Sequence, residues 1–215
     1  WDSHLHLTIA VDQAGTTELL APMLVAYGVT TVREMGGDWQ RIQQLRNAIA
    51  SGQVVGPRIF APGPFVDGPQ PADVNFQPVA NEAEARQAVR KLKTDGVDFI
   101  KVQAGLSLET WRAVVDESQK AGTPVAGHIP EAVSAFDVAR STQRSVEHVS
   151  PVLPGDAGIM LACSSKESEL RAELASIKKA SEDKNANRQQ LRQRQRDLQR
   201  AIATTYDAKK CEELF

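Results

Sequence analysis

The side chains best suited to chemistry in this sequence are its histidines, of which the chain has four. His4 and His6 are separated by a single residue, and on a β-strand this spacing points both imidazoles to the same side. Two imidazoles that converge on one point supply nitrogen ligands for a Zn²⁺-class ion. Taken alone, the pair fits two hydrogen-bonded, half-buried histidines equally well. His128 and His148, taken alone, fit ordinary residues at strand ends.

All four histidines fall on short apolar runs or at the C-terminal ends of these runs, which alternate with amphipathic helical patterns. Strict alternation predicts a parallel sheet with right-handed crossovers, and about 25 residues per unit fits an incomplete (β/α)8 TIM barrel of about six units. We therefore expect one curved parallel sheet with the four imidazoles at its C-terminal rim, which is the functional face of such barrels. The expected strands are Asp2–Thr8, Val29–Met35, Pro57–Ala61, Phe99–Val102, Pro124–His128 and Ser145–Val149, and the expected helices are Thr16–Tyr27, Trp39–Ser51, Glu82–Asp95, Leu108–Ala121 and Ala132–Ser141.

One connection does not fit the alternation. The segment Pro62–Val79 carries five prolines and is too long and irregular for a simple turn. We interpret it as either a functional lid or a disordered connector. Elsewhere, Arg33 and Glu34 at the end of the second expected strand could contact substrate or each other, and the sequence does not decide between these roles.

The composition changes towards the C-terminus, because no glycine or proline follows Gly158. Leucine and isoleucine spacing beyond this point predicts two amphipathic helices with a turn at Ser181–Asn187, and Asp207 could cap a third helix. We therefore divide the chain into a (β/α) barrel part at 1–162 and an amphipathic helical segment at 163–215. The narrow apolar stripe favours a helical excursion, with a coiled coil that binds a partner or a second copy of the chain as the alternative.

Charge and hydropathy exclude two classes of partner. The barrel part carries a net charge of −5 and the helical segment +3, which together give the −2 of the whole chain, so neither has the one-signed charge of a nucleic-acid-binding surface. No apolar run is long enough to cross a membrane. Two cysteines without a CxxC spacing leave the compartment undecided between the cytoplasm and an oxidising space. The start at Trp1, without a methionine, indicates a processed chain or a fragment.

Six short motifs follow one another in residues 1–162. They are Trp-Asp-Ser-His-Leu-His-Leu (Trp1–Leu7), Gly-Val-Thr-Thr-Val-Arg-Glu (Gly28–Glu34), Gly-Pro-Arg-Ile (Gly56–Ile59), Asp-Phe-Ile-Lys-Val (Asp98–Val102), Val-Ala-Gly-His (Val125–His128) and Val-Glu-His (Val146–His148). Together they resemble the metal-dependent amidohydrolase superfamily, nearest to its branch of imidazolonepropionase-like enzymes and Xaa-Pro dipeptidases (prolidases). The resemblance continues into Ala162–Arg171, where relatives carry a similar Cys-Ser-Ser stretch and a helical excursion.

This resemblance implies two divalent metal ions of the Zn class and a hydrolase that cleaves a C–N bond. His4 and His6 would bind the more buried ion, and His128 and His148 would bind the second. Lys101 would bridge the ions as a carbamate formed with CO₂, because an ammonium group beside two dications is repelled. Judged from the residues alone, Lys101 could instead be a strand-end lysine that reaches solvent. A hydroxide activated by the binuclear centre would then attack the carbonyl of a dipeptide or cyclic amide.

The sequence departs from the family at its acid–base group. The aspartate that family members carry after the eighth strand has no counterpart in these residues, so the catalytic residue is unknown, with Asp156 or Glu147 as possible substitutes. We therefore expect residues 1–215 to be inactive alone and to be a piece of a longer enzyme. The alternative is a catalytically inactive (β/α) fragment or subunit whose helical tail mediates assembly.

Overall fold

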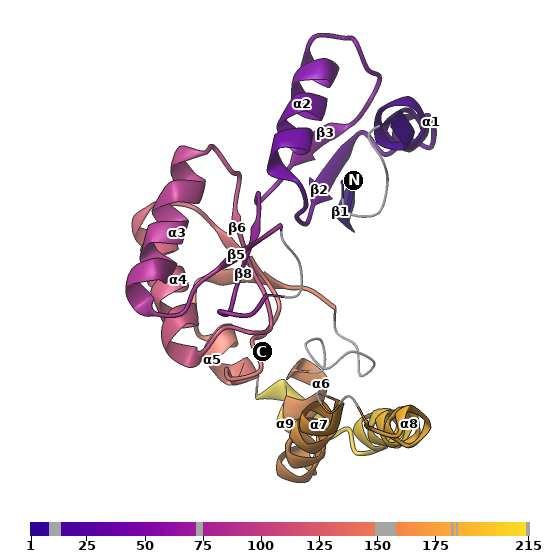
Figure 1. The fold of residues 1–215 in the computed structure, drawn as a ribbon, viewed down its shortest axis with the longest axis vertical. Helices are drawn as coiled ribbons and strands as arrows, with labels where there is room; N and C mark the ends of the chain where they lie inside the picture. Colours follow the sequence, from indigo (N-terminus) through magenta and orange to yellow (C-terminus); the bar gives the residue numbers. More distant parts are fainter. Residues whose placement is uncertain (9–13, 72–74, 149–157, 182, 184, 214–215) are drawn as a thin grey trace.

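Two parallel sheets and their flanking helices make up the structure, a computed structural model that describes all residues except 9–13, 72–74, 149–157, 182, 184 and 214–215. Within the described residues one sheet has the order β1-β2-β3 and the other β5-β4-β6-β7-β8 (Figure 1). The strands are β1 (Asp2–Leu5), β2 (Thr31–Glu34), β3 (Arg58–Phe60), β4 (Phe65–Asp67), β5 (Phe76–Pro78), β6 (Ile100–Val102), β7 (Val125–Gly127) and β8 (Gln143–Val146). The helices of this part are η1 (Gly15–Leu20, a π-helix), α1 (Ala21–Ala26), α2 (Trp39–Ala50), α3 (Glu82–Thr94), α4 (Leu108–Lys120) and α5 (Ala135–Ala139).

All strand pairs are parallel and most crossovers run through helices, which confirms the predicted class of an incomplete (β/α) barrel. Side-chain caps begin the main helices where the sequence expects them to begin. Asp38, Asn81 and Ser107 each accept a hydrogen bond from a backbone amide in the first turn of α2, α3 and α4. The expected end of the last strand at Val149 lies outside the described residues.

The interpretation of Pro62–Val79 as a lid or disordered connector is wrong over the two short strands β4 and β5. Phe65, Val66 and Asp67 of β4 are all buried, and β4 pairs with both β5 and β6. Pro78 ends the edge strand β5, where a missing backbone N–H costs little. Three-residue strands between prolines are too short to give a periodic signal, which is why the sequence pattern does not reveal them.

The expectation of one continuous sheet is also wrong, because the described strands form two sheets that meet through side chains and loops. Ala61 follows β3, and Asp98 precedes β6. The Asp98 amide donates a hydrogen bond to the carbonyl oxygen of Ala61 at 2.9 Å, and the Asp98 carboxylate accepts one from the Ala61 amide at 2.8 Å. A small apolar cluster that includes Met35 and Phe99 lies between the sheets. The chain therefore bends away from β2 at Ala61 and continues into the second sheet.

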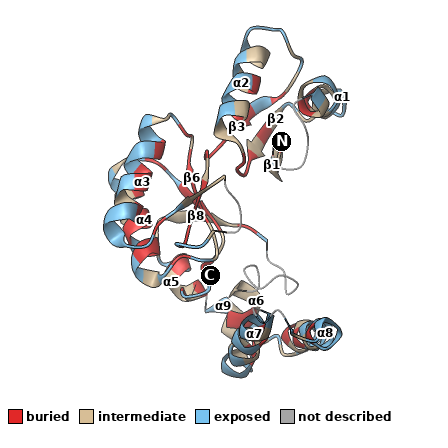
Figure 2. Ribbon diagram, in the orientation of Figure 1, coloured by how far each residue is buried: buried red, intermediate tan, exposed pale blue. Residues whose placement is uncertain are grey.

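Each sheet has its own hydrophobic core. In the first sheet Val32 and Ile59 pack beneath Ile42 and Leu45 of α2. In the second sheet the helices α3 and α4 bury their inner faces, which Figure 2 shows in red, while their outer faces stay exposed. Among the described residues no helix combines the length and the apolar character that a membrane span needs.

Helices α6 (Gly158–Ala162), α7 (Glu167–Ser181), α8 (Arg188–Thr204) and α9 (Ala208–Glu212) form a group that we call the helical unit. It lies at the end of the molecule opposite the three-stranded sheet (Figure 1). The predicted pair of amphipathic helices is present as α7 and α8, and Asp207 caps α9 as expected. A disulfide between Cys163 and Cys211, which the sequence interpretation did not include, joins the beginning of the unit to its end.

The apolar stripe of the helical unit is buried within the chain itself. Its core consists of six buried residues from α6, α7 and α8 that pack on one another. At the base of the unit, the Asp207 amide donates to the carbonyl oxygen of Cys163 at 2.8 Å, next to the disulfide. The core residues are Leu161, Leu170, Ile177, Leu191, Leu198 and Ile202.

Candidate metal centre

The four histidines lie together although they come from both sheets. His4 is on β1, His6 follows this strand, and His128 and His148 follow β7 and β8. The ring centroids of His4 and His148 are 4.3 Å apart. Those of His4 and His6, and those of His128 and His148, are each 5.3 Å apart. The structure therefore places four imidazoles in one cluster at the C-terminal ends of their strands.

Lys101 is buried beside this cluster, on β6, in register with Ala126 of the neighbouring β7. Only 1% of Lys101 is exposed, so the alternative of a strand-end lysine that reaches solvent is wrong. Its Nζ lies 4.9 Å from the ring centroid of Phe65, and the centroid of the His6 imidazole lies 5.9 Å from the same ring. A buried ammonium is costly, which makes this position a candidate for a chemical or electrostatic role.

Glu147, which follows β8 of the second sheet, orients His4 on β1 of the first sheet. Its Oε2 lies 2.7 Å from His4 Nδ1, and its Oε1 accepts hydrogen bonds from Arg33 Nη2 and Ser145 Oγ, each at 2.7 Å. Burial alone would raise the pKa of this carboxyl, but the hydrogen bonds from His4 and Ser145 and the charge of Arg33 outweigh burial and lower the pKa to about 2. Glu147 is therefore a carboxylate that accepts a hydrogen bond from His4 Nδ1–H.

This arrangement leaves the other nitrogen of His4 available as a ligand. His4 Nε2 is buried and has no hydrogen-bond partner among the described residues. An imidazole whose Nδ1–H donates to a carboxylate and whose Nε2 faces an ion is the usual form of a metal-bound histidine. The sequence suggested that Arg33 could contact substrate or Glu34, whereas the structure directs the Arg33 guanidinium to Glu147 and to the carbonyl oxygen of Ser3.

His6 is held by the turn that follows β2. Its Nδ1 lies 2.9 Å from the carbonyl oxygen of Gly36, which also leaves Nε2 for a ligand role. The fully buried Glu34 carboxylate fixes this turn, because it accepts hydrogen bonds from the Gly36 amide at 2.9 Å and from the Leu7 amide. Gly36 has φ +113°, and a Cβ at this position would overlap the ring of Phe65. Only glycine fits here.

His148 has an unusual backbone conformation. Its φ is 61°, which makes it the one non-glycine residue with positive φ in the described part of the chain. Such conformations cost free energy in ordinary residues and cluster at functional sites. The strained backbone brings the His148 ring to its position between His4 and His128.

The four imidazoles have the donor chemistry that a Zn²⁺-class ion prefers. No group of three or more His, Cys, Asp or Glu side chains that could hold a metal ion is formed in the part of the chain that the structure describes. The orphaned His4 Nε2 and the hydrogen-bonded Nδ1 atoms of His4 and His6 are the features that match imidazole ligation. Asp156, a suggested acid–base group, lies outside the described residues.

The parallel (β/α) barrel part carries its candidate site at the C-terminal ends of its strands, which is where enzymes of this architecture place their active sites. The model of the amidohydrolase family matches residues 1–200. The chain therefore belongs to the amidohydrolase family. The search of curated proteins found no match to this sequence.

Several solved structures share the fold. The chain is similar to a Xaa-Pro dipeptidase with methionine bound in its active site, at 23% identity and a TM-score of 0.56, over 99% of this chain and 62% of that one. It is similar to the ochratoxinase of A. niger at 18% identity and a TM-score of 0.61, over 100% and 60% of the two chains. A bottromycin amidohydrolase matches at 20% identity and a TM-score of 0.60, over 96% and 55%. The chain thus spans between 55% and 62% of the length of these three structures.

Proposed function

We propose that this chain provides the metal-binding part of a hydrolase that cleaves amide C–N bonds. The observation that carries the proposal is the cluster of four imidazoles beside a buried lysine, at the C-terminal ends of parallel strands. Membership of the amidohydrolase family supports the same reaction class. The similarity to a Xaa-Pro dipeptidase supports a dipeptide-like substrate, with a cyclic amide as the alternative.

The ligand roles in this proposal follow the two pairs of histidines. His4 and His6 would hold one divalent ion, His128 and His148 would hold a second, and Lys101 would bridge both as a carbamate. Two Zn²⁺-class ions supply a Lewis acid for the substrate carbonyl and make water acidic enough to ionise near neutral pH.

The other residues of the site keep the ligands in place. Glu147 accepts a hydrogen bond from His4 Nδ1, which leaves Nε2 as the ring nitrogen that would bind a metal ion. Arg33 keeps Glu147 ionised, and Glu34 fixes the turn that carries the Gly36 carbonyl oxygen and hence His6. Both carboxylates are engaged in hydrogen bonds, so we assign the acid–base step to neither of them.

The competing function, a helical tail that mediates assembly, has less support. The leucines and isoleucines of α7 and α8 that would form such an interface are buried against each other inside the helical unit. An apolar stripe that is already covered has little free energy to give to a partner chain. We retain the division into a barrel part at 1–162 and a helical segment at 163–215 as a proposal.

The test uses the full-length protein that contains this chain. The expected result is about two equivalents of a divalent metal per polypeptide and hydrolysis of Xaa-Pro or other dipeptides in the presence of bicarbonate. Lys101→Met removes the carbamate, so it should lower both the metal content and the hydrolysis rate. The matched control Lys91→Met removes a surface lysine with a 63% exposed side chain and should change neither. Full metal content and rate in Lys101→Met would reject the bridging role.

A further inference from the structure

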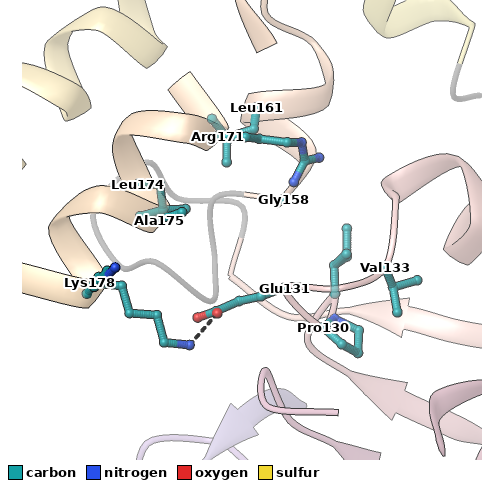
Figure 3. A pocket seen from close by; sticks show the side chains of 11 residues that line it. Pro130, Glu131, Val133, Gly158, Leu161, Arg171, Leu174, Ala175 and Lys178 are labelled. Carbon is teal, nitrogen blue, oxygen red and sulfur yellow. Dashed lines mark hydrogen bonds and ion pairs between the residues drawn. The ribbon is translucent and has the colours of Figure 1, made fainter. Parts of the chain in front are cut away.

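A cavity lies between the segment that follows His128 in the barrel part and the helical unit. Its volume is about 300 Å³, and its described walls come from the segment after β7 and from α6 and α7 (Figure 3). Glu131 in this wall is three residues beyond His128, so their Cα atoms are at most about 11 Å apart. Ile129, which also lines the cavity, directly follows His128, so one cavity wall belongs to the same segment as one of the four histidines.

The cavity combines apolar walls with an excess of positive charge. Ile129, Val133 and Leu174 give it apolar surface, whereas its described ionisable side chains are three cations and one carboxylate. Lys178 and the carboxylate, Glu131, pair with each other at 2.5 Å, as the dashed line in Figure 3 shows. The two remaining cations are Lys179 and Arg171, and Arg171 shares the carboxylate of Glu167, which does not line the cavity, with Lys210.

Arg171 is the cavity cation that has a buried hydrogen-bond donor without an acceptor among the described residues. Its Nε donates to Glu167 Oε1 at 2.9 Å, but Glu167 also accepts from Lys210 Nζ at 2.6 Å, so one carboxylate serves two cations. Arg171 Nη2 is buried and has no partner among the described residues. Figure 3 shows the Arg171 side chain extending from α7 along the cavity wall towards Gly158. A buried guanidinium N–H without an acceptor is costly, and such exceptions in native proteins need an explanation.

We propose that this cavity binds the carboxylate of the substrate or of the released amino acid, with Arg171 as the principal anchor and Lys179 as a second cation. The proposal deepens the proposed function and rests on it, because it assigns the C-terminal carboxylate of a dipeptide-like substrate to a subsite beside the histidines. The planar guanidinium matches the fork of a carboxylate. The apolar walls favour a ligand with one charged end and an apolar body over inorganic phosphate, whose oxygens would all need polar partners.

The experiment measures equilibrium binding rather than turnover. Full-length protein is titrated with N-acetyl-L-leucine and with N-acetyl-L-leucinamide, which differ only in the carboxylate, by isothermal titration calorimetry. The carboxylate should bind about tenfold or more tightly, as expected for a charge-assisted pair. Arg171→Gln should abolish this preference, and Arg171→Lys should restore part of it. The control Arg194→Gln removes a surface arginine of α8 that is likewise paired through Nε with a glutamate, Glu173, and should leave the preference intact.

A second variant tests whether Arg171 binds the ligand carboxylate or only stabilises the fold through its ion pair with Glu167. Glu167→Gln removes the ion pair of Arg171 but leaves its Nη2 in place, so the carboxylate preference should persist or increase. Loss of the preference in Glu167→Gln equal to that in Arg171→Gln would overturn the proposal, and so would equal binding of both probes by the wild type. Arg171-dependent binding without hydrolysis of any dipeptide would reject the proposed function and leave the subsite standing. Hydrolysis without carboxylate preference would reject the subsite alone.

Discussion

The barrel part and the helical unit are held together in opposite ways. In the barrel part, polar contacts between residues far apart in sequence surround the candidate site, and one carboxylate, Glu147, joins the end of β8 to His4 on β1 and to Arg33 on β2. In the helical unit a small apolar core is closed by one covalent bond, the disulfide between Cys163 and Cys211. The site therefore depends on polar contacts between distant residues, whereas the helical unit adds a covalent bond to its small apolar core.

This difference predicts that removal of the disulfide has the largest effect, and that the effect is local. The double variant Cys163→Ala/Cys211→Ala opens a loop that spans 48 residues, so the chain-entropy model gives a loss of about 4 kcal/mol in the stability of the helical unit. Hydrogen exchange should show faster exchange in α7 and α8 and unchanged protection in α3 and α4. The wild type under reducing conditions should behave like the variant. Equal loss of protection in α3 would contradict the separation of the two regions.

A glycine tests how tightly the barrel part is packed around the site. Gly36→Ala combines a positive φ with a Cβ that overlaps the Phe65 ring, so we expect a loss of about 3 kcal/mol in the free energy of unfolding. Gly28→Ala is the matched control. It has φ +82° with nothing near the added Cβ, and should cost only about 1 kcal/mol. The measurement is chemical denaturation of the three proteins, and equal losses would show that Phe65 can move aside.

The elements of the barrel part could be predicted because their signals are local. Apolar runs, helical periodicity and capping residues such as Asn81 and Ser107 lie within a few residues of the structure that they specify. β4 could not be predicted in this way. Its three residues follow Pro64, and they form a strand because β5 pairs with them 11 positions later and β6 pairs with Val66 at Val102, 36 positions later.

The site was predictable in its residue types and in the ends of the strands, but not in its contacts. The four histidines stand out by their spacing, and the parallel sheet explains why they meet. The partner of His4, however, is Glu147, which lies 143 residues further along the chain. No periodicity in the sequence links residues at that distance. For the same reason, the disulfide between Cys163 and Cys211 could not be predicted from the sequence pattern. The only available signal for Glu147 was its position next to His148.

The polar network of the barrel part can be tested through metal binding. Glu147→Gln keeps the shape of the side chain but removes the charge that orients His4 and pairs with Arg33. Loss of such a partner of a ligand typically weakens metal affinity by about 10–100-fold. We expect a loss of that size for the full-length protein, measured with a competing chelator. Glu84→Gln, a change at the exposed N-terminus of α3, is the control and should bind metal normally. Unchanged affinity in Glu147→Gln would remove His4 from the ligand set.

The smallest expected effect concerns the ion pairs of the helical unit. Burial of Glu167 would raise the pKa of its carboxyl, but hydrogen bonds from Lys210 and Arg171 outweigh burial and hold this pKa below its usual range. A carboxyl whose pKa is lower in the folded state stabilises the protein above its unfolded pKa of about 4.3, and this stabilisation is lost as the pH falls through the folded pKa.

Glu167→Gln should therefore lower the free energy of unfolding at pH 7 by about 1 kcal/mol or less, because the three side chains remain between 24% and 32% exposed and water screens their charges. The difference between wild type and variant should shrink as the pH falls below about 4. Denaturation curves at several pH values, recorded with the disulfide intact, measure this difference. If the difference in the free energy of unfolding stays constant down to the lowest pH, Glu167 stabilises the helical unit through packing. The ion pairs of Glu167 then contribute nothing measurable to the stability of the unit.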